Sequence, residues 1–133
     1  MILDTNILLM LVHHPESPIV EWVENAQARA SLHINPIIFA EMSPNFAKLD
    51  DLECYIAGLA ISIEGFTNIE CYRAGQAFIE YRRRGGQRES ILPDFMIGAQ
   101  AEIRGWPLVT RDLKGFASYF PDLVVIDPFE GSI

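Results

Sequence analysis

The first nine residues, MILDTNILL, place one carboxylate inside a run that is otherwise mostly apolar. The pattern predicts a short buried strand at Ile2 and Leu3, followed by a buried helix that begins near Ile7. An aspartate at such a junction is costly to bury unless something compensates its charge. A metal ion would compensate it, so other acids of the chain are candidates to meet Asp4 around one cation.

Length and composition indicate a single well-packed domain over residues 1–133. Half of the residues are hydrophobic and the mean hydropathy is +0.15, which excludes a disordered chain. Cys54 and Cys71 form no C-x-x-C pair, so we interpret them as free thiols on helices of a cytoplasmic protein. The apolar-rich run 54–63 is about half the length of a membrane span, and the N-terminus lacks the basic segment of a signal peptide.

The net charge of −8 argues at first against a nucleic-acid partner, but the charges are unevenly distributed. Residues 1–72 hold ten acids and two bases, whereas residues 73–133 hold eight of each. An acidic protein with this asymmetry can still present a local basic surface. For the run Arg82 to Arg84, the alternative interpretation is the solvated end of a helix.

Short apolar strands are predicted to alternate with helices. The expected strands are 1–3, 32–34, 107–110 and 123–126, and the expected helices begin near residues 7, 18, 36, 51, 68 and 93. The helix beginning at Asp51 is expected to run to Ile63, and its apolar face is interpreted as core or as a dimer or antitoxin surface. This alternation is typical of an α/β sandwich with a mainly parallel sheet.

Four acids fall where strand ends and helix starts can converge, which is where open α/β sheets bind ligands. Asp4 follows the first strand, Glu41 lies on the helix after the second, Asp94 begins a helix, and Asp112 lies two residues after Thr110. Clustered carboxylates repel one another without a cation, and Mg²⁺ and Mn²⁺ prefer carboxylate oxygens. Taken singly, Asp94 and Asp112 also fit helix or turn caps, and Glu41 fits an exposed helix acid.

The order of these motifs resembles a known family. The segments are LDTN at 3–6, FAE at 39–41, LPDFMIGAQA at 92–101, TRD at 110–112 and YFP at 119–121. Together they resemble the PIN-domain family, and most closely the VapC-like toxins of prokaryotic toxin–antitoxin pairs, over essentially the whole chain. The resemblance implies a PIN-like, Rossmann-like three-layer sandwich whose short-stranded sheet is flanked by helices.

The resemblance also implies an activity, that of a Mg²⁺- or Mn²⁺-dependent endoribonuclease. Water activated by the metal would attack an RNA phosphodiester in line and leave a 5′-phosphate and a 3′-hydroxyl. By motif match, the catalytic and metal-binding acids would be Asp4, Glu41, Asp94 and Asp112. Polar side chains that would support these carboxylates through hydrogen bonds are Thr5, Asn6 and Thr110.

The basic residues before Asp94 are candidate contacts for RNA phosphates or for an antitoxin. They are Arg82, Arg83, Arg84 and Arg88, and their sequence positions leave these two uses open. In the toxins that this chain resembles, an antitoxin commonly covers the active-site region. We therefore expect an RNA substrate, a cognate antitoxin and a homodimer, and no membrane partner.

Two other classes of function were weighed. A phosphatase of the haloacid-dehalogenase type would use Asp4 as a nucleophile, but it needs a second acid two residues later, where this chain has Asn6. A catalytically silent interaction module on the same fold is the other alternative, and the presence of all four acids argues against it. His13, His14 and His33 have no nucleophile at a telling spacing, and we interpret them as loop and strand-edge residues.

Overall fold

A computed structural model describes residues 1–87, 91–112 and 118–130. Its centre is a five-stranded sheet in the order β3-β2-β1-β4-β5, in which every neighbouring pair is parallel. The strands are β1 (Ile2–Leu3), β2 (Leu32–Ile34), β3 (Ile61–Ile63), β4 (Leu108–Val109) and β5 (Val125–Ile126). The expected α/β architecture with a short-stranded parallel sheet is thus confirmed.

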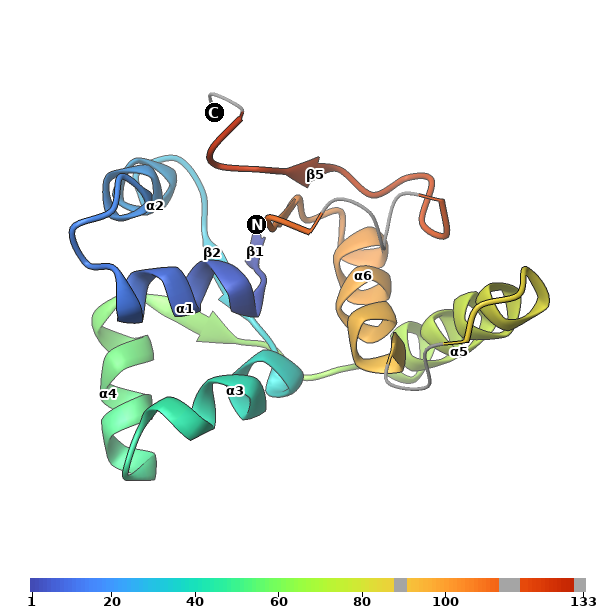
Figure 1. Cartoon of the computed structure of the whole chain (residues 1–133), viewed down its shortest axis with the longest axis horizontal. Coiled ribbons are helices and arrows are strands. Elements are labelled where there is room, and N and C mark those ends of the chain that lie inside the picture. The colour runs from blue at the N-terminus through green and yellow to red at the C-terminus, as the bar shows by residue number, and fades with distance from the viewer. Residues whose placement is uncertain (88–90, 113–117, 131–133) are drawn as a thin grey trace.

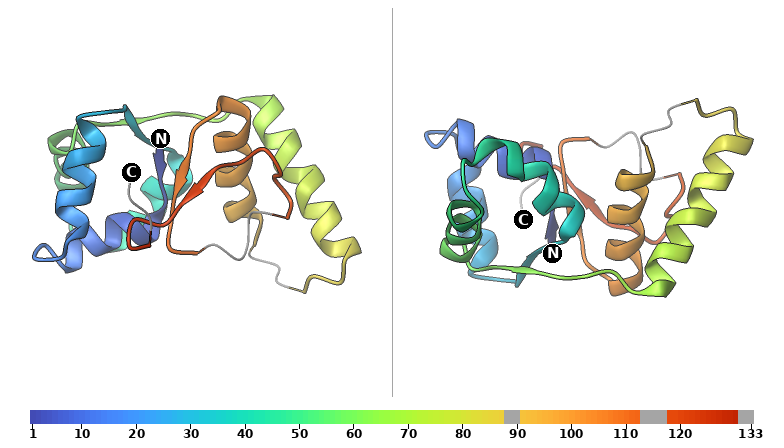
Figure 2. Two further views of the ribbon diagram at one scale, coloured as in Figure 1. Left: turned by 90° about the horizontal axis from the view of Figure 1, so that it is seen from above. Right: turned by 90° about the horizontal axis from the view of Figure 1, so that it is seen from below.

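Helices cover both faces of this sheet. They are α1 (Thr5–His13), α2 (Ile19–Gln27), α3 (Pro36–Met42), the short 3₁₀ helix η1 (Ser43–Asn45), α4 (Leu49–Gly58), α5 (Asn68–Arg83) and α6 (Leu92–Arg104). Figures 1 and 2 show α1 to α4 on one side of the strands and α5 with α6 on the other. Right-handed crossovers require this separation, because the chain progresses from β1 to β3 and then returns past β1 to β4.

The core lies on both faces of the central strands. Ile2 and Leu3 of β1 and Leu108 and Val109 of β4 have no exposed surface, as expected for strands that are covered by helices on both sides. Phe95 of α6 packs edge-on against Phe120 at 5.9 Å between ring centroids, within a larger cluster of aromatic rings. Within the described ranges, no helix is both long enough and apolar enough to cross a bilayer.

The segment expected as one helix from Asp51 to Ile63 is instead a helix and a strand, so this prediction was wrong in its second half. Helix α4 ends at Gly58, and Ala60 turns the chain with a positive φ of 55°. Ile61 then pairs with Leu32 in the sheet. Alternate apolar residues at 59, 61 and 63 suit a strand as well as a helix, so periodicity alone did not separate the two.

A buried polar network joins α3, α6 and the segment after β3. Asn35 caps α3 by accepting a hydrogen bond from the Ile38 amide at 3.0 Å, and its side-chain amide donates to Gln100 Oε1 at 2.9 Å. Gln100 Nε2 in turn donates to the carbonyl oxygens of Glu64 and Gly65. Asn35 and Gln100 are completely buried, so these bonds satisfy groups that have no access to water.

An ion pair fixes α6 against α5. Arg104 Nε lies 2.6 Å from Glu70 Oε2, and only 1% of Glu70 is exposed. Burial by itself raises the pKa of Glu70, but the hydrogen bonds and charge of Arg104 and the Thr67 amide outweigh it and lower the pKa. Helix α6 then ends at Gly105, whose φ of 68° is the left-handed conformation of a helix C-cap. This turn leads into β4 and sets the direction of α6.

Candidate acidic active site

The candidate site begins at Asp4, which leaves β1 and caps α1. Its side chain accepts a hydrogen bond from the Thr5 amide at 2.8 Å, and its own amide donates to the Val109 carbonyl at 2.9 Å. Only 8% of the residue is exposed. The strand-to-helix junction expected from the sequence is confirmed, and it holds a nearly buried carboxylate at the carboxyl end of the central strand.

Thr110, directly after β4, connects Asp4 to the second acidic segment. Its hydroxyl donates to Asp4 Oδ2 at 2.8 Å and accepts from Asn6 Nδ2 and from the Asp112 amide, both at 3.0 Å. Thr110 is completely buried, so its one donor and two acceptor positions are all used inside the protein. The hydroxyl therefore holds the backbone of Asp112 beside the carboxylate of Asp4.

Thr5 makes the corresponding link to Glu41. Its hydroxyl, on the first turn of α1, donates to Glu41 Oε1 on α3 at 2.7 Å. Glu41 is exposed, whereas Asp4 is not, so the two carboxylates lie at different depths. Asp4 at the N-cap of α1 and Thr5 in its first turn thus connect the end of β1 with Glu41 on α3.

The electrostatics of Asp4 favour a cation. Burial raises its pKa, while the hydrogen bonds from Thr110 and Thr5 act in the opposite direction. The charges of Glu41 and Asp112 raise the pKa further, and the net shift is upward. A positive ion at this place would relieve both the desolvation and the repulsion.

Asp94 reaches the same edge of the sheet through the direction of α6. It is the third residue of this 13-residue helix, which is about 20 Å long at 1.5 Å per residue. Three residues connect the end of α6 to the start of β4, so the helix runs back along the sheet and begins near the carboxyl ends of the strands. Both views in Figure 2 show the start of α6 on the same side as the ends of β1 and β4.

The structure connects the predicted acids to different extents. Glu41 and Asp112 act on Asp4 through their charges, and Asp94 is placed by its helix. Among residues 1–87, 91–112 and 118–130, no three Asp, Glu, His or Cys side chains are grouped closely enough to hold a metal ion. The donor set consists of carboxylate oxygens beside a nearly buried acid, and this chemistry suits a hard divalent cation.

Two arginines of the basic run at the end of α5 make contacts within the protein. Arg84 Nε pairs with Glu80 at 2.9 Å and its guanidinium lies over the Tyr119 ring, while Arg82 donates to the Gly86 carbonyl. Arg88 lies outside the described residues. Arg111 was not among the predicted site residues, although it lies inside the TRD segment. Its amide donates to Asn6 Oδ1 at 3.2 Å.

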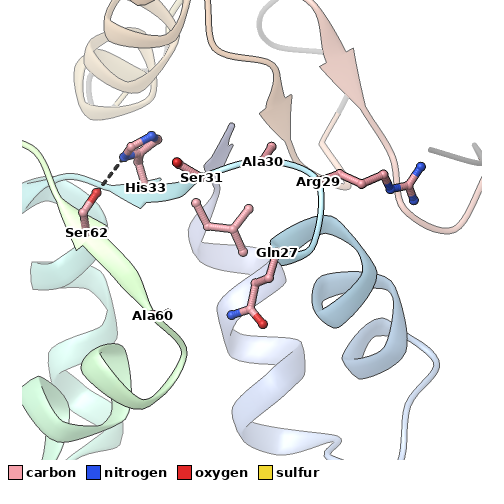
Figure 3. Close-up of a pocket in the computed structure, with 8 residues that line it drawn as sticks. Gln27, Arg29, Ala30, Ser31, His33, Ala60 and Ser62 are labelled. Atoms are coloured by element: carbon pink, nitrogen blue, oxygen red, sulfur yellow. Dashed lines mark hydrogen bonds between the residues drawn. The ribbon is translucent and has the colours of Figure 1, made fainter.

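A separate cavity of about 560 Å³ opens at the opposite edge, where β2 and β3 begin (Figure 3). His33 on its wall stacks on Trp106 at 4.0 Å, and its Nδ1 lies 2.6 Å from Ser62 Oγ and 3.7 Å from Glu64 Oε1. A catalytic relay would need the base and the acid on different ring nitrogens. We therefore still interpret His33 as a strand-edge residue without a catalytic role.

Solved structures with the same fold come from toxin–antitoxin assemblies. VapBC2 from Rickettsia felis, bound to a DNA fragment from its promoter, matches with a TM-score of 0.75 and 18% identity over 94% of this chain and 96% of that chain. VapBC-1 from nontypeable Haemophilus influenzae gives 0.76 and 17%, covering 97% and 98% of the two chains. A toxin–antitoxin complex from Klebsiella pneumoniae gives 0.68 and 25%, covering 98% of each.

A search of curated proteins finds no match to this sequence. The sequence profile of the PIN domain, by contrast, matches residues 1–119, which include Asp4, Glu41, Asp94 and Asp112. The match extends from the first strand past the last of the four acids, and it agrees with the sheet order and with the solved structures. The chain therefore belongs to the PIN domain family.

Proposed function

We propose that this protein is a metal-dependent endoribonuclease and the toxin of a VapBC-type pair. The observation that carries the proposal is the nearly buried carboxylate of Asp4, which accepts hydrogen bonds from the Thr5 amide and the Thr110 hydroxyl. Burial and the charges of Glu41 and Asp112 raise its pKa. A structural role would favour pairing such an acid with an arginine, as this chain does for Glu70. Membership of the PIN family supports nuclease chemistry at this position.

The proposed roles follow from the motif match and, for Asp4 and Glu41, also from their hydrogen bonds. The residues that would hold Mg²⁺ or Mn²⁺ are Asp4, Glu41, Asp94 and Asp112. When bound, the cation supplies Lewis acidity for the attacking water and the phosphoryl oxygen. Thr110 and Thr5 orient the carboxylates of Asp4 and Glu41 through their hydroxyls.

Asn6 has a positioning role in this proposal. Its amide nitrogen donates to Thr110, and its amide oxygen accepts from the Arg111 backbone. Both ends of the amide are thus used to connect α1 with the segment after β4. This arrangement gives Asn6 a different task from the second acid that a phosphatase of the haloacid-dehalogenase type would need there.

The partners are proposed from the similar structures and from the surface. The solved toxin–antitoxin complexes support a cognate antitoxin for this chain, acting in the cytoplasm. Ile69 and Tyr72 of α5 are 70% and 71% exposed, which supports a self-associating surface and the proposed homodimer. Sedimentation of the purified chain with and without its antitoxin would test both assemblies.

Cleavage of a mixed tRNA and rRNA pool with Mn²⁺ is the direct test of the activity. Wild type should cut the pool, and EDTA or Asp94→Asn should abolish cutting. Asp51→Asn is the control: exposed Asp51 lies in the first turn of α4, and half-buried Asp94 lies in the first turn of α6. Cleavage that survives both EDTA and Asp94→Asn would contradict the proposal.

A selective toxin can leave bulk RNA intact, so metal binding gives an independent test. Mn²⁺ should raise the melting temperature of wild type and of Asp51→Asn, but not that of Asp4→Asn. A chain that binds Mn²⁺ through Asp4 and cuts none of the RNAs of its own host would be the silent interaction module. A chain whose melting temperature ignores Mn²⁺ would contradict the metal site itself.

A further inference from the structure

Arg111 lies beside the acidic site and its backbone is fixed to it. The residue follows Thr110 and precedes Asp112, and its amide donates to Asn6 Oδ1 at 3.2 Å. Asn6 in turn donates to Thr110, whose hydroxyl reaches Asp4. A short series of hydrogen bonds thus fixes the Arg111 backbone relative to the carboxylate of Asp4.

Two soft groups hold the guanidinium of Arg111. Its Cζ lies 4.5 Å from the centroid of the Phe129 ring, and its Nη1 lies 3.7 Å from Met10 Sδ. The Phe129 amide donates to Asp127 Oδ1 at 2.9 Å, a contact that closes the turn after β5. An aromatic ring under the guanidinium occupies its face, so the N–H groups that do not reach Met10 can bind an anion.

Arg111 differs from three other arginines of the chain, which each form an ion pair with a glutamate. Arg73, Arg84 and Arg104 each lie within 4 Å of a glutamate. Within the ranges that the structure describes, no carboxylate pairs with the guanidinium of Arg111, although the acidic site begins one residue away. Arg111 is exposed, so its charge faces the solvent from which a substrate would arrive.

An acidic nuclease site needs such a cation. Four carboxylates repel a polyanion, and a metal ion compensates only the phosphate that it contacts. A guanidinium held at the rim can bind a neighbouring phosphate through two parallel hydrogen bonds. In the basic run at the end of α5, Arg84 is already paired with Glu80 and Arg82 donates to the Gly86 carbonyl oxygen.

We infer that Arg111, held on Phe129 and Met10, binds an RNA phosphate next to the cleaved bond. This assignment rests on the proposed ribonuclease function and names a substrate-contacting residue for it. Phe129 is a positioning residue, which acts by holding the guanidinium. The assignment makes Arg111, more than Arg82 to Arg84, the arginine that RNA affinity depends on.

RNA binding without cleavage gives the test. A labelled single-stranded RNA of mixed sequence would be titrated in EDTA at several KCl concentrations. For Arg111→Gln, the dissociation constant should rise about tenfold, the effect of one lost charge-assisted hydrogen-bonded contact. The slope of log affinity against log salt should become shallower by about 0.7, the value for one phosphate contact on a single strand.

Three further variants separate the charge from its placement. Arg111→Lys should keep the salt slope but lose affinity, because an ammonium neither stacks nor binds in a fork. Phe129→Leu should also keep the slope and lose affinity, since the charge remains but its support does not. Arg29→Gln, an equal charge change at the opposite edge of the sheet, is the control and should behave as wild type.

The outcomes distinguish this inference from the proposed function. Equal affinity and slope for Arg111→Gln and Arg29→Gln, with a wild type that binds RNA, would overturn the inference and leave the ribonuclease in place. A wild type that binds no RNA at low salt would overturn both. Unchanged RNA binding in Arg111→Gln together with weaker antitoxin binding would identify the rim as a protein-binding site and would also overturn the inference.

Discussion

The hydroxyl of Thr110 donates a hydrogen bond to Asp4 Oδ2 at 2.8 Å, although 106 residues separate the two in the chain. The Thr110 hydroxyl oxygen also accepts hydrogen bonds from the Asn6 side-chain amide and from the Asp112 backbone amide. A single buried side chain thus sets the position of two predicted acids, and its removal should affect both.

Thr110→Val should weaken Mn²⁺ binding about 10- to 100-fold, the usual effect of removing a hydrogen bond that orients a metal ligand. The substitution keeps the shape of the side chain, but it leaves the Asp4 carboxylate, the Asn6 amide and the Asp112 amide without their shared partner. Thr110→Ser keeps the hydroxyl and should stay within a few-fold of wild type. Calorimetric titration with Mn²⁺ would measure both, and equal affinities for Val and wild type would show that Thr110 does not orient the site.

Asp4 should make the metal-free protein less stable as the pH rises. Burial, with the charges of Glu41 and Asp112, raises the pKa of Asp4 in the folded state above its unfolded value. The folded chain therefore binds the proton more tightly, and its stability declines as the pH rises from the unfolded pKa through the folded one. Asp4→Asn lacks this contribution, so in urea unfolding with EDTA the stability of wild type should fall relative to that of Asp4→Asn as the pH rises from 4 to 7. Parallel curves would contradict the prediction.

Glu70 should have the opposite pH dependence. Although burial alone raises the pKa of Glu70, Arg104 and Thr67 lower it overall, so its stabilising contribution is present above the unfolded pKa and is lost as the pH falls through the folded one. Glu70→Gln should cost about 3 kcal/mol at pH 7, because the charge of Arg104 loses its buried partner. The cost should shrink near pH 3. Glu80→Gln, which breaks the half-exposed pair with Arg84, is the control and should cost less than about 1 kcal/mol.

Asn35→Ala should destabilise the chain by about 3 kcal/mol, which combines a lost helix cap with a buried acceptor left without its donor. Asn35 caps α3 and donates to Gln100 Oε1, and both side chains are completely buried. Asn25→Ala, at an exposed position on α2, gives the reference. Chemical denaturation of the two variants would decide the matter, and a cost for Asn35→Ala as small as that for Asn25→Ala would show that the network contributes little.

The sequence was sufficient for the strand-to-helix junction at Asp4, because a carboxylate in an apolar run has few structural explanations. It also placed β2, β4 and β5 and the start of α6 within a few residues. It did not reveal β3, since the turn at Ala60 uses neither glycine nor proline and the apolar spacing around it suits two structures. A pairing with β2 selects the strand, and that is a tertiary contact.

The contacts of the Arg111 guanidinium could likewise not be predicted from local sequence patterns. Its significance depends on Phe129 and Met10, which come from the turn after β5 and from α1. Gln100 was noted only as part of a motif, and its role becomes visible once Asn35 and the Glu64 carbonyl are seen beside it. Sequence patterns identified polar residues that are unfavourable to bury, whereas three-dimensional contacts were needed to show which partners compensate their burial.

The sheet order has a consequence for synthesis of the chain. Strand β1 is made first, yet its neighbour on one side is β4, and Ile2 pairs with Leu108. A ribosome that has completed α5 has therefore made β1, β2 and β3 but none of Asp94, Thr110 or Asp112. The acidic surface can close only after the segment with Thr110 and Asp112 has emerged and β4 has paired with β1. A partner that binds this surface would therefore meet a finished site, with no partly assembled precursor before it.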